Sequence, residues 1–279
     1  MNKSENRRIL TFILPSFIGF CVFYILPFIY SLKYALTDSV IDGKFIGLAN
    51  FYNVYTSEPF QLAIKNSLLF MGVSIPLNMI IPLVIGCLLN NVTRNKTLGA
   101  IFMSPLVIPS ACIAFFFQSV FASNGLVSQI SQTNMNWLRT DKSFWIVIAL
   151  YLWKNIGYNL VLIMAGLANI PKDYYEWASV EGMGKLRQFF RITIVYLIPS
   201  LFIVFVMSFI NSFKVFREIY MLSGSYPNEN IYMLQHYMNN QFTSLNYQNL
   251  TTASITVAVI ITLVVVAFFV IDKKSEFGE

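Results

Sequence analysis

Six long apolar runs dominate the sequence, and each is long enough to cross a membrane as a helix. A helix needs roughly 20 mostly apolar residues to cross the hydrocarbon core of a bilayer. Hydrophobic residues make up 56% of the 279 residues and charged ones 11%, whereas a soluble domain carries about 25% charged residues. The sequence therefore predicts an all-α polytopic membrane protein. The expected spans are approximately 9–32, 67–89, 98–122, 144–167, 192–213 and 252–271.

The basic residues indicate how these spans are oriented. Lys and Arg are more frequent at both ends of the chain and in the second and fourth loops than in the other loops. Loops rich in Lys and Arg stay in the cytoplasm, so both termini are expected there. The net charge of +6 thus reflects membrane orientation, and we expect no nucleic-acid partner. The first run is too long for a signal peptide and lacks a small-residue cleavage site, so we expect residues 1–279 to form a single transmembrane domain.

Residues that would indicate catalysis or metal binding are absent from the sequence. Cys21, Cys87 and Cys112 lie in apolar runs without metal-ligand spacing, so we expect no disulfide and no metal. His236 is the only histidine, and we expect it to be an exposed loop residue. No H-E-x-x-H or G-x-S-x-G motif occurs. The chain is therefore predicted to be no enzyme and to bind no cofactor.

The loop at approximately 168–191 is long, charged and helix-like. Pro171 and Asp173 suit a helix start, and Tyr175, Ala178 and Ser179 share one face. Gly182 and Gly184 then interrupt the helix, because glycine favours turns and positive φ, and a second helix begins at Lys185. These features fit equally an amphipathic connector lying on the membrane surface.

The same loop closely resembles the EAA loop of permease subunits of ATP-binding cassette importers. That loop has the pattern E-A-A-x-x-x-G, followed after a gap by F-x-x-I-T-x-P-x-L-x-P. Departures include Trp177 for an alanine, Glu181 for an aspartate and Val195 for a proline. The matching residues are Glu176, Ala178, Gly182, Phe189, Ile192, Thr193, Leu197 and Pro199.

Further segments along most of the chain resemble the carbohydrate-importer branch, in its maltose-permease-like partner. They are F-I-L-P-S-F-I-G-F at 12–20, F-I-G-L-A-N-F at 45–51, S-P-L-V-I-P-S at 104–110 and F-R-E-I-Y-M-L-S-G at 216–224. The resemblance implies the type I importer permease fold in a cell membrane. It also implies three kinds of partner beside lipid and sugar: a second homologous permease, two ATP-binding subunits that hold ATP and Mg, and an extracellular solute-binding protein.

The resemblance also implies a role for the loop, as a coupling helix that docks in a cleft of the ATPase. Tyr174, Tyr175 and Trp177 would be its aromatic anchors, and Glu176 would pair with a base on the partner. ATP-driven closure of the ATPases would then move the helices rigidly. The coupling residues are expected to be Tyr175, Glu176, Ala178, Glu181 and Gly182.

Polar residues inside the spans indicate a transport path. Tyr151, Lys154, Asn155 and Tyr158 fall at i, i+3, i+4 and i+7, one stripe of the fourth span. Sugars need hydrogen-bonding and aromatic groups, which this stripe offers. Ser67, Ser74 and Asn78 of the second span share a face too, but there helix–helix packing is the favoured interpretation. With the segments that the resemblance adds, the predicted path comprises Ser110, Tyr151, Lys154, Asn155, Tyr158, Asn211, Phe213 and Lys214.

Lys154 is unusual because no acidic residue lies in its own span. A charge within a membrane must be paired, neutralised or hydrated. Two explanations are equally weighted: contact with an acidic or phosphorylated sugar, or a hydrogen bond to a partner subunit. An ion-coupled secondary transporter is the alternative for the whole chain, although such proteins often carry carboxylates inside their spans and none lies well inside a span here.

Overall fold

The computed structural model describes the backbone of residues 3–90 and 96–276, and the side chains of residues 12–89 and 101–266. Within these residues the protein is helical, and six stretches are long and apolar enough to cross a membrane. The all-α fold with six spans is thereby confirmed. The stretches are Phe12–Ala35, Glu58–Leu89, Ser110–Ile130, Ser143–Ala168, Lys185–Ser223 and Tyr247–Val266.

The chain divides into two compact units, one formed by residues 1–61 with 237–279 and the other by residues 62–236. In the first unit, α1 (Lys3–Phe20), a π-helical turn η1 (Cys21–Ile25) and α2 (Leu26–Ala35) make the first span. Helix α14 (Tyr247–Glu276) packs against α2 and α3 (Ala49–Thr56). Phe12 and Phe23 of the first span are 84% and 75% exposed. Apolar surface of this extent requires lipid or another protein chain to cover it.

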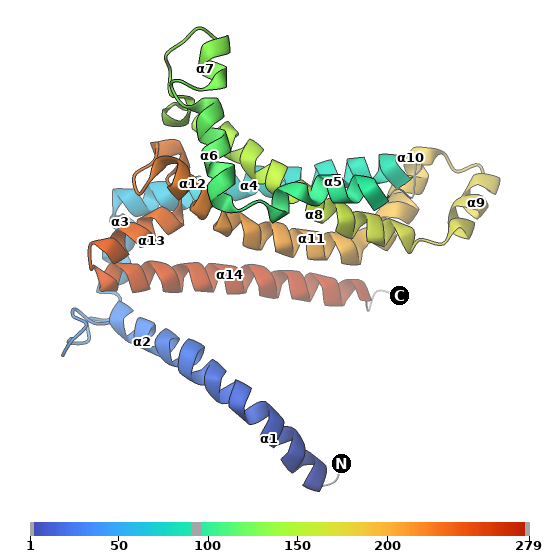
Figure 1. The fold of residues 1–279 in the computed structure, drawn as a ribbon. Coiled ribbons are helices and arrows are strands. Elements are labelled where there is room, and N and C mark those ends of the chain that lie inside the picture. The colour runs from blue at the N-terminus through green and yellow to red at the C-terminus, as the bar shows by residue number, and fades with distance from the viewer. Residues whose placement is uncertain (1–2, 91–95, 277–279) are drawn as a thin grey trace. The chain divides into compact units, whose positions relative to one another are not determined.

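The second unit is built around α8 (Ser143–Ala168), which packs against α5 (Lys96–Val107) and α11 (Ile194–Lys214) (Figure 1). A Cβ at Gly157 of α8 would lie 1.7 Å from the carbonyl oxygen of Phe102. Only glycine therefore allows α5 to approach α8 this closely. A buried polar network joins α8 and α11 to α4 (Glu58–Asn90).

The third span differs from the prediction of one helix over 98–122. The chain breaks after α5, and α6 (Ser110–Phe121) leaves in a new direction towards α7 (Leu126–Ile130) (Figure 1). Pro109 has extended backbone angles, φ −56° and ψ 139°. Proline donates no backbone hydrogen bond and disfavours helical geometry at the preceding residue, so the helix ends before it. The break leaves residues 108–109 as irregular chain that lines a cavity together with residues of α8.

The expected outer loop at 214–251 is also largely helical. It contains α12 (Phe216–Ser223), a short turn η4 (Glu229–Ile231) and α13 (Leu234–Thr243). The expectation that His236 is exposed is wrong, because its side chain is 0% exposed and its ring centroid lies 4.7 Å from that of Phe216. Burial lowers the pKa of His236 to about 3, so the imidazole is neutral.

Candidate functional site

A cavity of about 380 Å³ lies in the second unit, where the broken third span meets α8 and the junction of α11 with α12. The break before Pro109 positions Ser110, and the fourth span supplies its polar stripe. The last turn of α11 supplies Asn211 and Lys214. Segments distant in sequence thus form one polar-lined hollow. Of the predicted path residues, Ser110, Tyr151, Lys154, Asn155, Asn211 and Lys214 line it.

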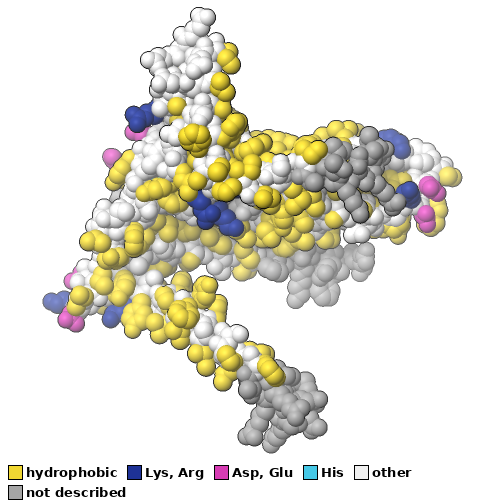
Figure 2. All heavy atoms as spheres, in the orientation of Figure 1, with side chains coloured by type: hydrophobic (Ala, Val, Ile, Leu, Met, Phe, Trp, Pro, Cys, Tyr) yellow, Lys and Arg dark blue, Asp and Glu magenta, His cyan; other side chains and the backbone are white. Residues whose placement is uncertain are grey.

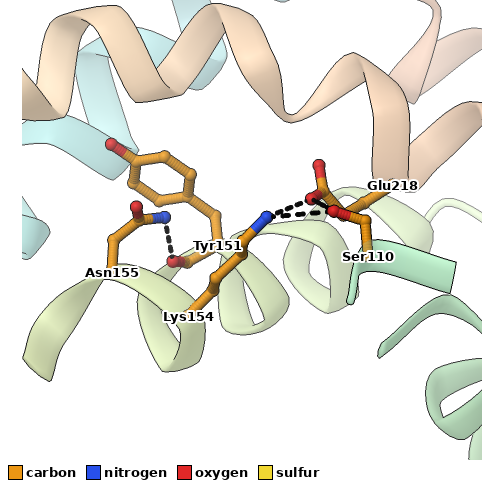
Figure 3. Close-up of polar contacts among 5 residues, drawn as sticks. All are labelled: Ser110, Tyr151, Lys154, Asn155 and Glu218. Carbon is orange, nitrogen blue, oxygen red and sulfur yellow. Dashed lines mark hydrogen bonds and ion pairs between the residues drawn. The ribbon is translucent and has the colours of Figure 1, made fainter. Parts of the chain in front are cut away.

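An ion pair crosses this cavity between α8 and α12. Lys154 Nζ is paired with Glu218 Oε1. Ser110 Oγ donates a hydrogen bond to the same oxygen at 2.8 Å, and Lys154 Nζ lies 3.3 Å from Ser110 Oγ (Figure 3). Glu218 is 3% exposed and Lys154 21%. The pair thus joins α8, α12 and the first residue of α6, and it gives Lys154 a partner that neither expected explanation included.

Glu218 and Arg217 are the charged residues of the cavity lining that were not predicted from the sequence. The fifth span was expected to end at residue 213, so both residues fell in an assumed outer loop. A signal was nevertheless present, because Val215, Ile219 and Leu222 are spaced i, i+4 and i+7 and are buried. Glu218 falls on that same face. A carboxylate on the apolar face of a helix indicates a buried partner charge.

The Tyr151 hydroxyl points away from the Lys154–Glu218 pair (Figure 3). Its side chain is 1% exposed, and its hydroxyl donates a 2.7 Å hydrogen bond to the Ser208 carbonyl oxygen on α11. Asn78 and Asn159 each donate a 3.0 Å hydrogen bond to Ser208 Oγ. This geometry supports helix–helix packing as the role of Asn78, and it extends that role to the hydroxyl of Tyr151.

Two predicted path residues lie outside the lining of this cavity. Tyr158 is half-buried on α8, one turn or more beyond Lys154. Phe213 lines a separate small pocket with Ser67 and Met71. A helical stripe covers more length than one cavity, because successive turns rise 5.4 Å. Tyr158, at i+7, therefore lies beyond the cavity that Lys154 and Asn155, at i+3 and i+4, line.

The loop after α8 has the predicted helix–turn–helix form. Helix α9 (Lys172–Val180) is followed by its C-cap Glu181 and then by Gly182, whose φ is +75°. The Met183 N–H donates to the Ala178 carbonyl at 2.8 Å, and the Gly182 N–H donates to the Ser179 carbonyl at 3.1 Å. These two bonds make a Schellman motif, which requires the left-handed conformation at Gly182. The chain then continues through α10 (Lys185–Gln188) and a π-helical turn η3 (Phe189–Thr193) into α11.

The two faces of α9 have different surroundings. Tyr175 and Ala178 face the chain itself: the Tyr175 hydroxyl lies 2.8 Å from Thr193 Oγ1, and Ala178 is 6% exposed. Trp177 and Val180 are 67% and 88% exposed. Glu176, Glu181 and Gly182 are exposed as well. Tyr175 therefore holds α9 in place, while Trp177 and Val180 form the apolar part of the outward face.

Comparisons with known proteins agree with this architecture. Residues 78–275 match the family described as binding-protein-dependent transport system inner membrane component. The chain is 30% identical over 232 residues to the probable ABC transporter permease protein YesP of Bacillus subtilis, across 79% of this chain and 75% of that protein. It is 29% identical to the trehalose/maltose transport system permease protein MalF of Thermococcus litoralis, across 77% and 76% of the two chains.

A solved structure has the same fold. It is a crystal structure of a bacterial ABC transporter involved in the import of the acidic polysaccharide alginate. A chain of that structure aligns with a TM-score of 0.78 at 24% identity, over 95% of this chain and 94% of that one. These matches identify the protein as a multi-pass membrane permease component of a binding-protein-dependent transport system, not as an enzyme. The chain belongs to the family of inner membrane components of binding-protein-dependent transport systems.

Proposed function

We propose that this chain forms one half of the translocation path of an ATP-driven oligosaccharide importer. A second homologous permease would supply the other half, two ATPase subunits would bind ATP and Mg, and an extracellular binding protein would deliver the sugar. The relative from Thermococcus litoralis is named for trehalose and maltose transport, which supports a saccharide as the solute. Residues 1–279 would act as one permease domain.

The observation that carries this proposal is the outward face of α9. Trp177 and Val180 are large apolar side chains held on a short helix, 67% and 88% exposed. The Schellman motif and the Tyr175–Thr193 contact hold this helix from behind. Exposed aromatic anchors on a rigid support are the usual energetic centre of a protein interface. A cleft of the ATPase would cover this face, with Glu176 and Glu181 pairing at its edge.

The cavity would be the part of the path that contacts the sugar. Ser110, Asn155 and Asn211 offer hydroxyl and amide groups there, and sugar hydroxyls need such partners when they leave water. Glu218, the carboxylate in the lining, is already paired with Lys154. An ion-coupled mechanism would need a carboxylate free to bind and release its ion, so ATP is the better-supported energy source.

Transport by the assembled importer in proteoliposomes tests the proposal. We expect sugar accumulation to require the binding protein and ATP on the cytoplasmic side. Val180→Glu places a charge at the apolar face of α9 and is expected to abolish both ATPase co-purification and accumulation. Ile130→Glu is the matched control, because Ile130 is 82% exposed on α7, away from the loop. Accumulation driven by an ion gradient without ATP would contradict the proposal.

A further inference from the structure

The charges lining the cavity do not balance. Lys154, Lys214 and Arg217 are cationic, whereas Glu218 is anionic. Glu218 Oε1 is already occupied by Lys154 and Ser110. Among the residues that the structure describes, Lys214 and Arg217 have no acidic side chain within ion-pair distance. The lining therefore offers two cations that the chain itself does not neutralise.

Apolar surface surrounds these cations. Leu106, Val107 and Leu150 line the same cavity, and Figure 2 shows basic side chains gathered on a largely hydrophobic face near the junction of α11 and α12. Next to apolar walls the effective dielectric constant is lower than in water, so a cation there attracts an anion more strongly. A neutral sugar would leave both charges unpaired when it displaced water from the cavity. An anionic sugar would pair them.

The ion pair decides which cations are available to a substrate. Lys154 is engaged by a carboxylate of its own chain, and that carboxylate would repel a second anion placed beside it. Lys214 ends α11, and Arg217 lies in the first turn of α12. Both side chains are exposed. Arginine binds a carboxylate with two parallel hydrogen bonds, which adds orientation to charge.

Resting on the proposed function, we propose that the cavity selects oligosaccharides that carry carboxylate groups, such as uronic acid residues. Lys214 and Arg217 bind the carboxylate. Ser110, Lys154 and Glu218 form a hydrogen-bonded wall with no net charge, which positions α12 and hence Arg217. This assignment transfers the anion-binding role from Lys154, the cation that the sequence singles out, to two cations near the α11–α12 junction.

The test uses the assembled importer in proteoliposomes with its binding protein. The probes are trisaccharides of galacturonic, glucuronic and mannuronic acid, each compared with its carboxyl-reduced neutral counterpart of identical linkage. Measurements are sugar-stimulated ATP hydrolysis and uptake. We expect a uronate trisaccharide to stimulate and its neutral counterpart to do so poorly. Arg217→Gln should raise the KM for the uronate about tenfold, since a hydrogen bond to a charged group is lost.

Arg139→Gln is the matched control, because Arg139 is an exposed arginine outside the cavity lining. It should leave the KM unchanged. Vesicles of phosphatidylcholine alone and vesicles containing phosphatidylglycerol distinguish a sugar anion from a lipid phosphate. The Arg217→Gln effect should be the same in both, and an effect confined to anionic vesicles would overturn the proposal.

Stimulation by neutral trisaccharides only, with no effect of Arg217→Gln, would overturn the charge selection while leaving the importer function intact. If neither the uronate nor the neutral trisaccharides are taken up in the presence of ATP, the proposed function fails and this inference fails with it. If uronates stimulate but Arg139→Gln is as harmful as Arg217→Gln, the cavity assignment is wrong.

Discussion

The loop at residues 168–191 and the cavity, both in the second unit, are built in opposite ways. The loop is contiguous in sequence, and its hydrogen bonds join residues two to five positions apart or span the short turn to α10 and η3. The cavity joins residues 44, 64 and 108 positions apart. The loop presents apolar side chains outward, whereas the cavity turns charges inward. A surface that a partner covers can be encoded locally, while a path for a polar solute needs several helices to converge.

Removing the carboxylate of the ion pair should produce the largest effect and should act on the cavity alone. Glu218→Gln leaves the Lys154 ammonium group without a counter-charge. Breaking a buried pair from one side costs about 3 kcal/mol at the lower end of its range, which applies because Lys154 keeps 21% of its side chain exposed. We expect the free energy of unfolding in detergent to fall by about this amount, measured by thermal or denaturant unfolding.

Glu181→Gln is the control for this loss, since Glu181 is an exposed carboxylate in the loop. It should leave the unfolding free energy unchanged. The double variant Lys154→Met with Glu218→Leu removes both charges. It should recover much of the lost stability, because no buried charge is then left without a counter-charge. An equal loss in the single and double variants would show that the ion pair does not hold α8 to α12.

Truncating the aromatic residue on the outward face of α9 should weaken partner binding and spare the fold. Trp177→Ala removes a 67% exposed side chain, so the unfolding transition should not move. We expect the ATPase to bind about 30-fold more weakly, a loss of about 2 kcal/mol that is typical of an interface hot spot. The measurement is titration of purified ATPase onto the permease complex in nanodiscs.

Trp145→Ala is the matched control, because Trp145 is 61% exposed on α8 and distant from the loop in sequence. It should leave ATPase affinity unchanged. A large fall in the unfolding temperature of Trp177→Ala would contradict the assignment of Trp177 to a partner-facing surface, since its side chain would then contribute to the stability of the fold.

Acid should destabilise the region of α12 through His236. Burial lowers the pKa of His236 to about 3, against 6.5 for the free side chain. Between those pH values the unfolded chain binds a proton that the folded chain does not, so stability is full above pH 6.5 and falls as the pH drops. From pH 7.5 to 5.5 we expect a loss of about 1.4 kcal/mol from this residue, measured by unfolding at each pH.

His236→Gln should remove most of that pH dependence. In the wild type, the Met233 N–H donates to His236 Nδ1 at 3.2 Å, and protonation of Nδ1 would remove this acceptor. The same acid loss in the variant and the wild type would assign the effect to another group. ATPase binding at the outward face of α9 should not change with the titration of His236. The effect of acid would then be confined to the region of α12.

The smallest effect is expected from loss of the hydrogen bond between Tyr175 of α9 and Thr193. Tyr175→Phe removes the hydroxyl that lies 2.8 Å from Thr193 Oγ1. The loss of one hydrogen bond of this kind costs about 1 kcal/mol, and it should appear as faster amide hydrogen exchange across α9. Tyr174→Phe is the control, because Tyr174 lies on the exposed side at 40% exposure. Equal exchange in both variants would mean that the Tyr175 hydroxyl does not restrain the helix.

Errors in the sequence prediction fall where spans were delimited by apolarity alone. Residues 98–122 read as one helix because proline is tolerated in membrane helices, yet Pro109 divides them. The fifth span was ended at residue 213, which placed Glu218 and His236 in a loop where both are in fact buried. Apolarity measures the distance across a bilayer and does not report whether the following turns stay packed against other helices.

The sequence by itself determined the number of spans and the helix–turn–helix form of the loop at 168–191, with its turn at Gly182. Hydrophobic length and a positive φ at a glycine are properties of the local chain. Only the tertiary structure decided that Lys154 is paired with Glu218, that Tyr151 directs its hydroxyl into the core, and that Lys214 and Arg217 line the cavity. A charge in a membrane protein finds its partner by proximity in space, and here that proximity arises from a broken helix and the packing of α12 against α6.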